Sequence, residues 1–347
     1  MPLFFVTSGL PFSYSLKTTH PAKRPHNEQL IMNRTKTAQV VALSLGLLAA
    51  APVTRATPLQ QTDVAADPVW LLHVDCDRLR PTAVGQHLLA EMEKPNAQNK
   101  LAAFQAMFKF DLRTQLHGLT LYSVGQSPEE GVLLVYADFD ADHLSTLAKG
   151  ARDYESSPHN QRVIHSWVDD SKMKSKDSKQ RTYAAAQGSR LLIFGQRAAA
   201  VAKALDVLDV AAPNLTVSKS FPALESKSAF LQGAAQKMTL KNSDPNAAVF
   251  RMSKSLRFEI GEEQNRVNAT LQLTANDDEV AKQIVSIGQG LVSLMKLQKD
   301  RPEAGKLADA LTLKQEASDV VVSFSIPVGD AIDLMKADAA RKAKKDE

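Results

Sequence analysis

Two stretches decide the fold that this sequence predicts: VLLVYADFDADHL at residues 132–144 and ATLQLTANDDEV at residues 269–280. Each opens with an apolar run or alternation that is typical of a β-strand. Each continues with a helix-capping residue, Asp140 or Asn276, and an acid two positions later. Asn276 with Glu279 further resembles a capping box. The same order of strand, cap and helix therefore occurs in each half of the chain.

A second pair of stretches extends the correspondence. RLLIFGQRAAAVAKAL at 190–205 and DVVVSFSIPVGDAIDLM at 319–335 both read as a strand followed by a closing helix. We therefore predict an α+β protein with a duplicated β-β-α-β-β-α unit. Its two similar lobes would each be a mostly antiparallel sheet with helices on one face. The alternative is a coincidental likeness between two ordinary α+β lobes.

The remaining pattern sets the predicted boundaries. The lobes span 69–212 and 213–336, with an inter-lobe connection at 211–222 and a polar, frayed tail at 337–347. Further strands are expected at 69–77, 119–125, 131–139, 162–169, 181–188, 247–254, 255–263, 266–275 and 311–317. A polar loop is expected at 170–180.

The residues before the first lobe predict export. Residues 32–56 combine the positive Arg34 and Lys36, a charge-free run over 38–53, and small residues ending at Ala56. This is the pattern of a signal peptide, and we expect cleavage after Ala56, followed by a linker at 57–68. An uncleaved single-span anchor is the alternative. Residues 1–31 would then be a non-native or disordered extension, and translation would start at Met32.

Composition excludes several classes of function. The 347 residues are 44% hydrophobic and 23% charged, which is an ordinary globular balance. Residues 1–56 hold six of the 42 basic and one of the 38 acidic residues, so the rest carries a net charge of −1. A nearly neutral chain has no field that steers nucleic acid or anionic lipid. We expect no nucleic-acid partner, and membrane contact only in transit through the signal peptide. The single cysteine, Cys76, excludes an internal disulfide.

The strand expected at 69–77 carries the best candidate for a metal site. Its alternation places His73, Asp75 and Asp77 on one face, and imidazole with carboxylates suits a divalent transition metal. His165, from another strand, could join them. The opposing interpretation is an ordinary solvated strand face. On the other face Cys76 has no histidine beside it, which predicts an inert thiol.

Other catalytic patterns fail on specific residues. DFDADH at 138–143 starts like a calcium-binding loop, but His143 and Lys149 occupy the positions that require glycine and glutamate. The chain has no G-x-S-x-G, HExxH, P-loop or GxGxxG motif. We therefore expect no catalytic or cofactor-binding set and no cofactor.

The stretches LTLYSVG, EGVLLVYADFDADHLSTLAKG and RTYAAAQGSRLLIFGQ resemble uncharacterised exported bacterial proteins of the planctomycete and verrucomicrobial type. The resemblance covers roughly residues 69–335, and its motifs are structural. It implies an envelope location, no known activity and no functional residues.

Together these observations predict a non-catalytic exported protein, periplasmic or secreted, that acts as a binding or scaffold module for an unknown envelope or extracellular ligand or protein. The alternative is a metal-dependent hydrolase that uses His73, Asp75 and Asp77.

Overall fold

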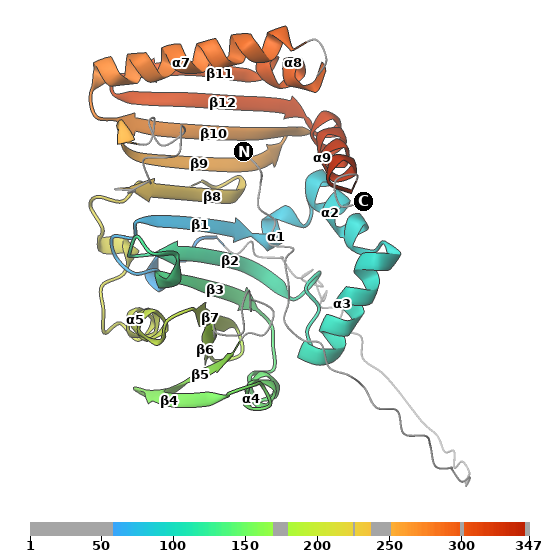
Figure 1. Ribbon diagram of the computed structural model, residues 1–347, viewed down its shortest axis with the longest axis vertical. Coiled ribbons are helices and arrows are strands. Elements are labelled where there is room, and N and C mark those ends of the chain that lie inside the picture. The colour runs from blue at the N-terminus through green and yellow to red at the C-terminus, as the bar shows by residue number, and fades with distance from the viewer. Residues whose placement is uncertain (1–57, 169–179, 225, 237–250, 299–301, 344–347) are drawn as a thin grey trace, which may run out of the picture. The chain divides into compact units, whose positions relative to one another are not determined.

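Twelve antiparallel strands form one continuous sheet in the computed structural model, which describes residues 58–168, 180–224, 226–236, 251–298 and 302–343 (Figure 1). The spatial order is β11-β12-β10-β9-β8-β1-β2-β3-β7-β6-β5-β4. The strands of the first half are β1 (Trp70–Asp75), β2 (Leu116–Ser123), β3 (Gly131–Ala137), β4 (Glu155–His159), β5 (Arg162–Val168), β6 (Arg181–Gln187) and β7 (Leu191–Gly195). Those of the second half are β8 (Ala229–Gln236), β9 (Ser253–Glu263), β10 (Arg266–Ala275), β11 (Leu311–Glu316) and β12 (Asp319–Pro327).

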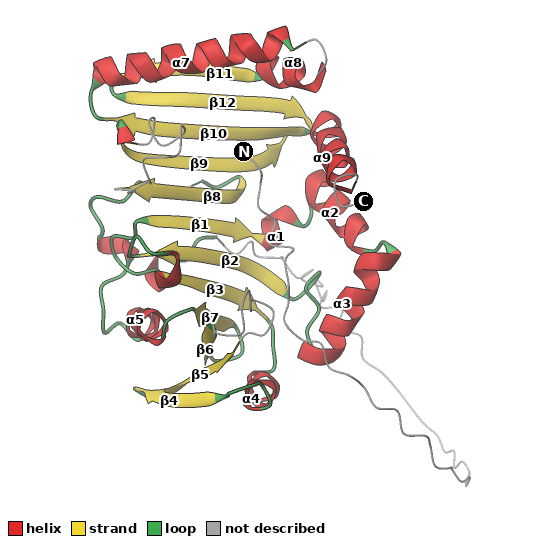
Figure 2. Ribbon diagram, in the orientation of Figure 1, coloured by secondary structure: helices red, strands yellow, loops and turns green. Residues whose placement is uncertain are grey.

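Helices connect the strands along the whole sheet, from α4 and α5 near the β4 edge to α7 and α8 near the β11 edge (Figure 2). They are α1 (Cys76–Leu79), α2 (Ala83–Met92), α3 (Pro95–Phe108), α4 (Ala141–Lys149), α5 (Ala198–Leu208), α7 (Asp278–Leu297), α8 (Pro302–Asp309) and α9 (Val328–Ala343). Thr82 caps α2 and Asp140 caps α4, each by accepting a backbone N–H three residues ahead. No helix within the described ranges is both long and apolar enough to cross a membrane.

The α+β class and the antiparallel sheet are confirmed, but the two predicted lobes share one sheet. β8 pairs with β1, with Leu72 opposite Gly233, and this pairing joins the halves. The order of connections is similar on either side: β1-β2-β3-α4 leads to β7-α5, and β8-β9-β10-α7 leads to β12-α9. The duplication itself stays a prediction, and the first half has two additional strands, β4 and β5.

Alternate residues of the strands face opposite sides, which we call the His73 face and the Phe258 face. On the His73 face, α5 packs over β3 and β7, where Leu134, Ile193 and Leu205 are fully buried. On the Phe258 face, two separate cores form. One lies under α3 and α4 around Leu192, and the other lies under α7 around Leu273 and Ile284. The prediction of helices on one face is therefore wrong for the first half, which has helices on both.

Several predicted bounds also differ. The N-cap of α7 is Asp277, whose Oδ1 accepts the N–H of Val280 at 2.8 Å, so the predicted capping role of Asn276 is wrong. Residues 255–263 were expected as a separate strand but belong to the longer β9, which begins at Ser253. Most of the predicted tail is helical, because α9 continues to Ala343. The predicted extension at 1–31, the signal peptide at 32–56, nearly all of the loop at 170–180 and much of the strand at 247–254 lie outside the described residues.

Candidate functional site

The three candidate metal ligands do not share a strand face. β1 ends at Asp75, because this residue caps α1: its Oδ1 accepts the N–H of Arg78 at 2.8 Å. Asp77 therefore lies inside α1, and the prediction that alternation continues to residue 77 is wrong. Among the described residues, no three or more His, Cys, Asp or Glu side chains are grouped so as to hold a metal ion.

His73 lies inside the sheet. It is 1% exposed, and its Nδ1 is 2.9 Å from Oγ1 of Thr120 on the neighbouring strand β2. On the other side it is paired with Gln232 of β8, which is also buried. His165 lies apart on β5, where its Nδ1 is 2.8 Å from the hydroxyl of Tyr154. Burial, with a smaller contribution from the charge of Lys149, lowers the pKa of His165.

A different polar cluster forms around His117, which the sequence analysis did not single out. His117 lies at an irregularity in β2, where the register with β3 shifts between Leu116 and Gly118. Its Nδ1 is 3.1 Å from both carboxylate oxygens of Asp77, and its Nε2 is 3.0 Å from Oδ2 of Asp138. Burial alone would lower the pKa of His117, but the hydrogen bonds to Asp138 and Asp77 outweigh it and raise that pKa.

Arg80 completes this cluster. Its Nη1 donates to Asp77 at 2.7 Å, and its other guanidinium nitrogens donate to the carbonyls of Arg113 and Leu116. The contacts tie the end of α1 to Arg113 and to the first residue of β2, Leu116. Burial raises the pKa of the neighbouring Cys76 thiol to about 12, which keeps this thiol protonated at neutral pH. The cluster therefore holds α1 against the start of β2.

Two of the three acids of DFDADH also have structural contacts. Asp138 contacts His117, and Asp140 caps α4 by accepting the N–H of His143 at 2.9 Å. Capping and a favourable interaction with the helix dipole explain this acidic run.

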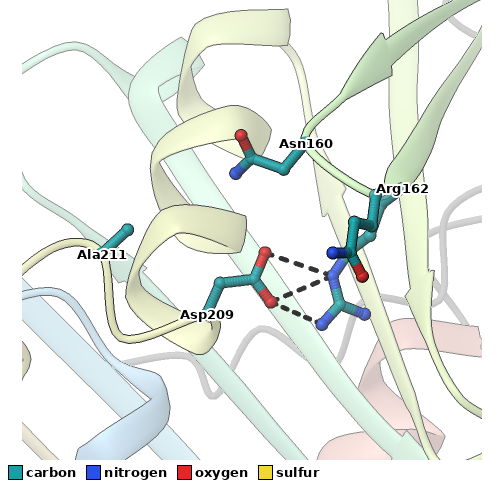
Figure 3. A pocket seen from close by; sticks show the side chains of 5 residues that line it. Asn160, Arg162, Asp209 and Ala211 are labelled. Carbon is teal, nitrogen blue, oxygen red and sulfur yellow. Dashed lines mark hydrogen bonds and ion pairs between the residues drawn. The ribbon is translucent and has the colours of Figure 1, made fainter.

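A shallow pocket lies between the β4–β5 turn and the end of α5 (Figure 3). Figure 3 shows Asn160 and Ala211 at its margin and the ion pair between Arg162 and Asp209 across it, with Nη2 to Oδ1 at 2.6 Å. Nearby, His159 Nε2 is 2.8 Å from Oδ1 of Asp206. These polar groups bind one another, so the pocket offers no convergent set of groups to a ligand.

The most distinctive surface is apolar. On the Phe258 face, the strands between the core under α3 and α4 and the core under α7 carry partly exposed apolar side chains. We call these residues the central apolar face: Leu72, Val74, Leu121, Leu231, Phe258 and Leu271. The strand register places them side by side, with Leu72 opposite Leu121 and Phe258 opposite Leu271.

Glycine shapes this surface. The ring of Phe258 lies over Gly233, where a Cβ would come within 2.7 Å of the ring. The ring of Trp70 lies near Gly131, where a Cβ would make an ordinary contact with it at 3.9 Å. The opposite side of β9 is polar, with Arg257 and Glu259 exposed. None of the residues that define the central apolar face belongs to a buried core. A contiguous apolar surface of this kind is typical of a binding site.

Comparisons with known proteins add only a distant likeness. No family model matches the chain, and no curated protein matches it. Two crystal forms of the Treponema protein TP0453 are similar at 8% and 9% identity, with TM-scores of 0.42 and 0.40. Each covers 80% of this chain and 97% or 96% of TP0453. At these values the likeness carries no argument about fold or function.

Proposed function

We propose that this chain is a non-catalytic exported protein of the bacterial envelope, periplasmic or secreted, and that it binds an apolar partner on the central apolar face. The observation that carries the proposal is the row of partly exposed apolar side chains across β2, β1, β8, β9 and β10. Such a row in water costs free energy, about 25 cal/mol for each Å² of apolar surface, and a bound partner would recover it.

The state of the polar candidates favours binding over catalysis. His73 is buried against Thr120, Asp75 caps a helix, and Asp77 is held by Arg80 and His117. Each of these side chains already has a structural contact. The metal-dependent hydrolase alternative would need His73, Asp75 and Asp77 to leave these contacts and converge.

Fluorescence of 1-anilinonaphthalene-8-sulfonate tests the binding surface. The full chain under native conditions should enhance the dye's fluorescence with saturable binding. Phe258→Lys should weaken binding about tenfold, because it replaces roughly 1.4 kcal/mol of apolar contact by a charge. The matched control is Ser255→Lys, which also adds one positive charge to the same strand but on the polar face.

Urea unfolding of each variant distinguishes loss of the surface from loss of the fold, because partly unfolded states also bind this dye. Equal dye binding by wild type and a folded Phe258→Lys variant would refute the proposed surface.

Export is tested separately by N-terminal sequencing of the protein recovered from the cell envelope or medium. Export with cleavage predicts a mature chain that begins just after Ala56. A chain that retains residues before Met32 would refute both the cleavage and the later start.

A further inference from the structure

α7 carries a second apolar surface. Ile287, Leu291 and Leu294 are 49%, 57% and 59% exposed, and they recur at the spacing of one helical side. We call them the α7 stripe. Charged side chains of α7, such as Lys282 and Lys296, lie on another side of the helix. Leaving three large apolar residues in water along a helix is unfavourable unless something covers them.

The position of α7 indicates where the stripe lies. The helix contacts β11, β12 and β10, and a Cβ on Gly288 would meet Leu313 of β11. In Figure 1 it crosses in front of β11. β10, α7 and β11 form a crossover between parallel strands, and such crossovers are right-handed. Successive residues of an α-helix are rotated by 100° about its axis. In a right-handed crossover, this rotation places the α7 stripe next to the buried Ile284, on the side of α7 that faces β12 and β9. The stripe therefore borders the central apolar face.

The chemistry of this combined surface is nearly uniform. Glu262 also faces this way, near the end of β9. From Leu256 to Ile260 on β9, and between the ends of β1 and β8, each position on this side carries an apolar side chain or glycine. These residues are Trp70, Leu72, Val74, Leu231, Gly233, Ala235, Leu256, Phe258 and Ile260. Among these side chains the indole N–H of Trp70 is the one hydrogen-bonding group, and none carries a charge. Such a surface therefore complements an uncharged hydrocarbon better than a polypeptide whose side chains require polar partners.

The bordering helices limit what can reach the strands. α7 packs on this face at one side, and α3 and α4 pack on it at the other. A helix on a sheet rises about 10 Å above the strands. A bilayer, or the same face of a second copy, would meet the helices first. The strands from β9 to β2 span three spacings, or ~14 Å, which leaves room for a slender chain.

We infer that the ligand is a single long-chain amphiphile, such as a fatty acid, whose acyl chain lies on the central apolar face against the α7 stripe. This inference rests on the proposed function and names its ligand class. The polar head of such a ligand stays in water at the end of the strands, as its chemistry requires.

Two tryptophans provide the test. Trp70 lies on the central strand β1 and borders the central apolar face, whereas Trp167 lies on β5, next to the edge strand β4. A brominated long-chain fatty acid quenches tryptophan on contact. Titrated into the full chain with Trp167→Phe, it should quench Trp70 saturably. Titrated into the Trp70→Phe chain, it should leave Trp167 unquenched. Equal quenching of the two tryptophans, or none, would overturn the inference.

The stripe has its own matched pair of variants. Leu291→Lys should weaken fatty-acid binding about tenfold, and because this residue is exposed, the substitution leaves the fold intact. Gln289→Lys places the same charge on another exposed side of α7 and should have no effect. Equal effects of the two would remove α7 from the site.

Further arms separate other occupants and the underlying proposal. Quenching of Trp70 by brominated phosphatidylcholine vesicles but not by the free fatty acid would replace the inferred ligand by a membrane. A concentration-dependent dimer that Leu291→Lys dissociates would replace it by a second copy. Dye binding that depends on Phe258, without quenching of Trp70 by the fatty acid, would overturn this inference and leave the proposed function standing.

Discussion

Replacing Asp77 by asparagine should destabilise the fold more than most single surface changes. The Asp77 carboxylate is 6% exposed and accepts from Arg80 at 2.7 Å and from His117 at 3.1 Å. A hydrogen bond to a charged group contributes about 1.5–3 kcal/mol. Asparagine keeps one acceptor oxygen, and Arg80 keeps its two carbonyl partners. The expected loss is therefore about 2–3 kcal/mol in the free energy of unfolding, below the ~3–5 kcal/mol for a fully orphaned buried charge.

Urea unfolding, followed by circular dichroism, measures this loss as a lower midpoint at unchanged slope. Asp209→Asn is the matched control. That residue pairs with Arg162 at 2.6 Å, but its side chain is 27% exposed, so the change should cost less than about 1 kcal/mol. An Asp77→Asn variant within ~0.5 kcal/mol of wild type would refute the structural role assigned to the His117 cluster.

Three further predictions concern other parts of the fold. The folded state raises the pKa of His117, so protonated His117 stabilises the fold fully below the unfolded pKa near 6.5, and this stabilisation is lost as pH rises through the folded pKa. His117→Asn should therefore flatten the dependence of the unfolding free energy on pH in this range. An unchanged pH profile would contradict the role of His117. Cys76, with its pKa raised to about 12, should resist iodoacetamide at pH 8 until urea unfolds the chain, and rapid labelling of the native protein would contradict the raised pKa. Leu134→Ala should lower the free energy of unfolding by about 2–5 kcal/mol, whereas Leu297→Ala, at a residue 72% exposed, should lower it by under ~0.5 kcal/mol. Equal losses would contradict the placement of Leu134 in the core under α5.

Strongly periodic elements could be predicted from the sequence, and elements without periodicity could not. β10 and α7 follow their expected patterns closely because each has one apolar and one polar side. β8 was missed because AFLQGAAQ is mostly small and polar, with Gln232 and Gln236 buried. Its two large apolar residues, Phe230 and Leu231, are adjacent, so they produce no alternation that identifies a strand. β4 was missed because ESSPH is polar and contains proline, which an edge strand tolerates.

The candidate site shows a similar division. Alternation correctly separated Leu72 and Val74 from His73, but it did not indicate that the apolar side would be only partly covered. Coverage depends on where α3, α4 and α7 pack, which is a tertiary property. The contacts of His117 with Asp77 and Asp138 join three separate elements through an irregular strand, and no spacing in the sequence indicates them.

The pairing of β8 with β1 has a consequence for biogenesis. β1 is made early, yet its partner β8 follows only after the rest of the first half has been synthesised. Until then β1 has an open edge, which is a template for aggregation. The pairing of β1 with β8 is therefore a non-local and slow folding step. A chaperone that holds the chain during translation would protect the open edge of β1 until β8 is made. A truncated first half would keep that edge permanently and should be insoluble when expressed alone.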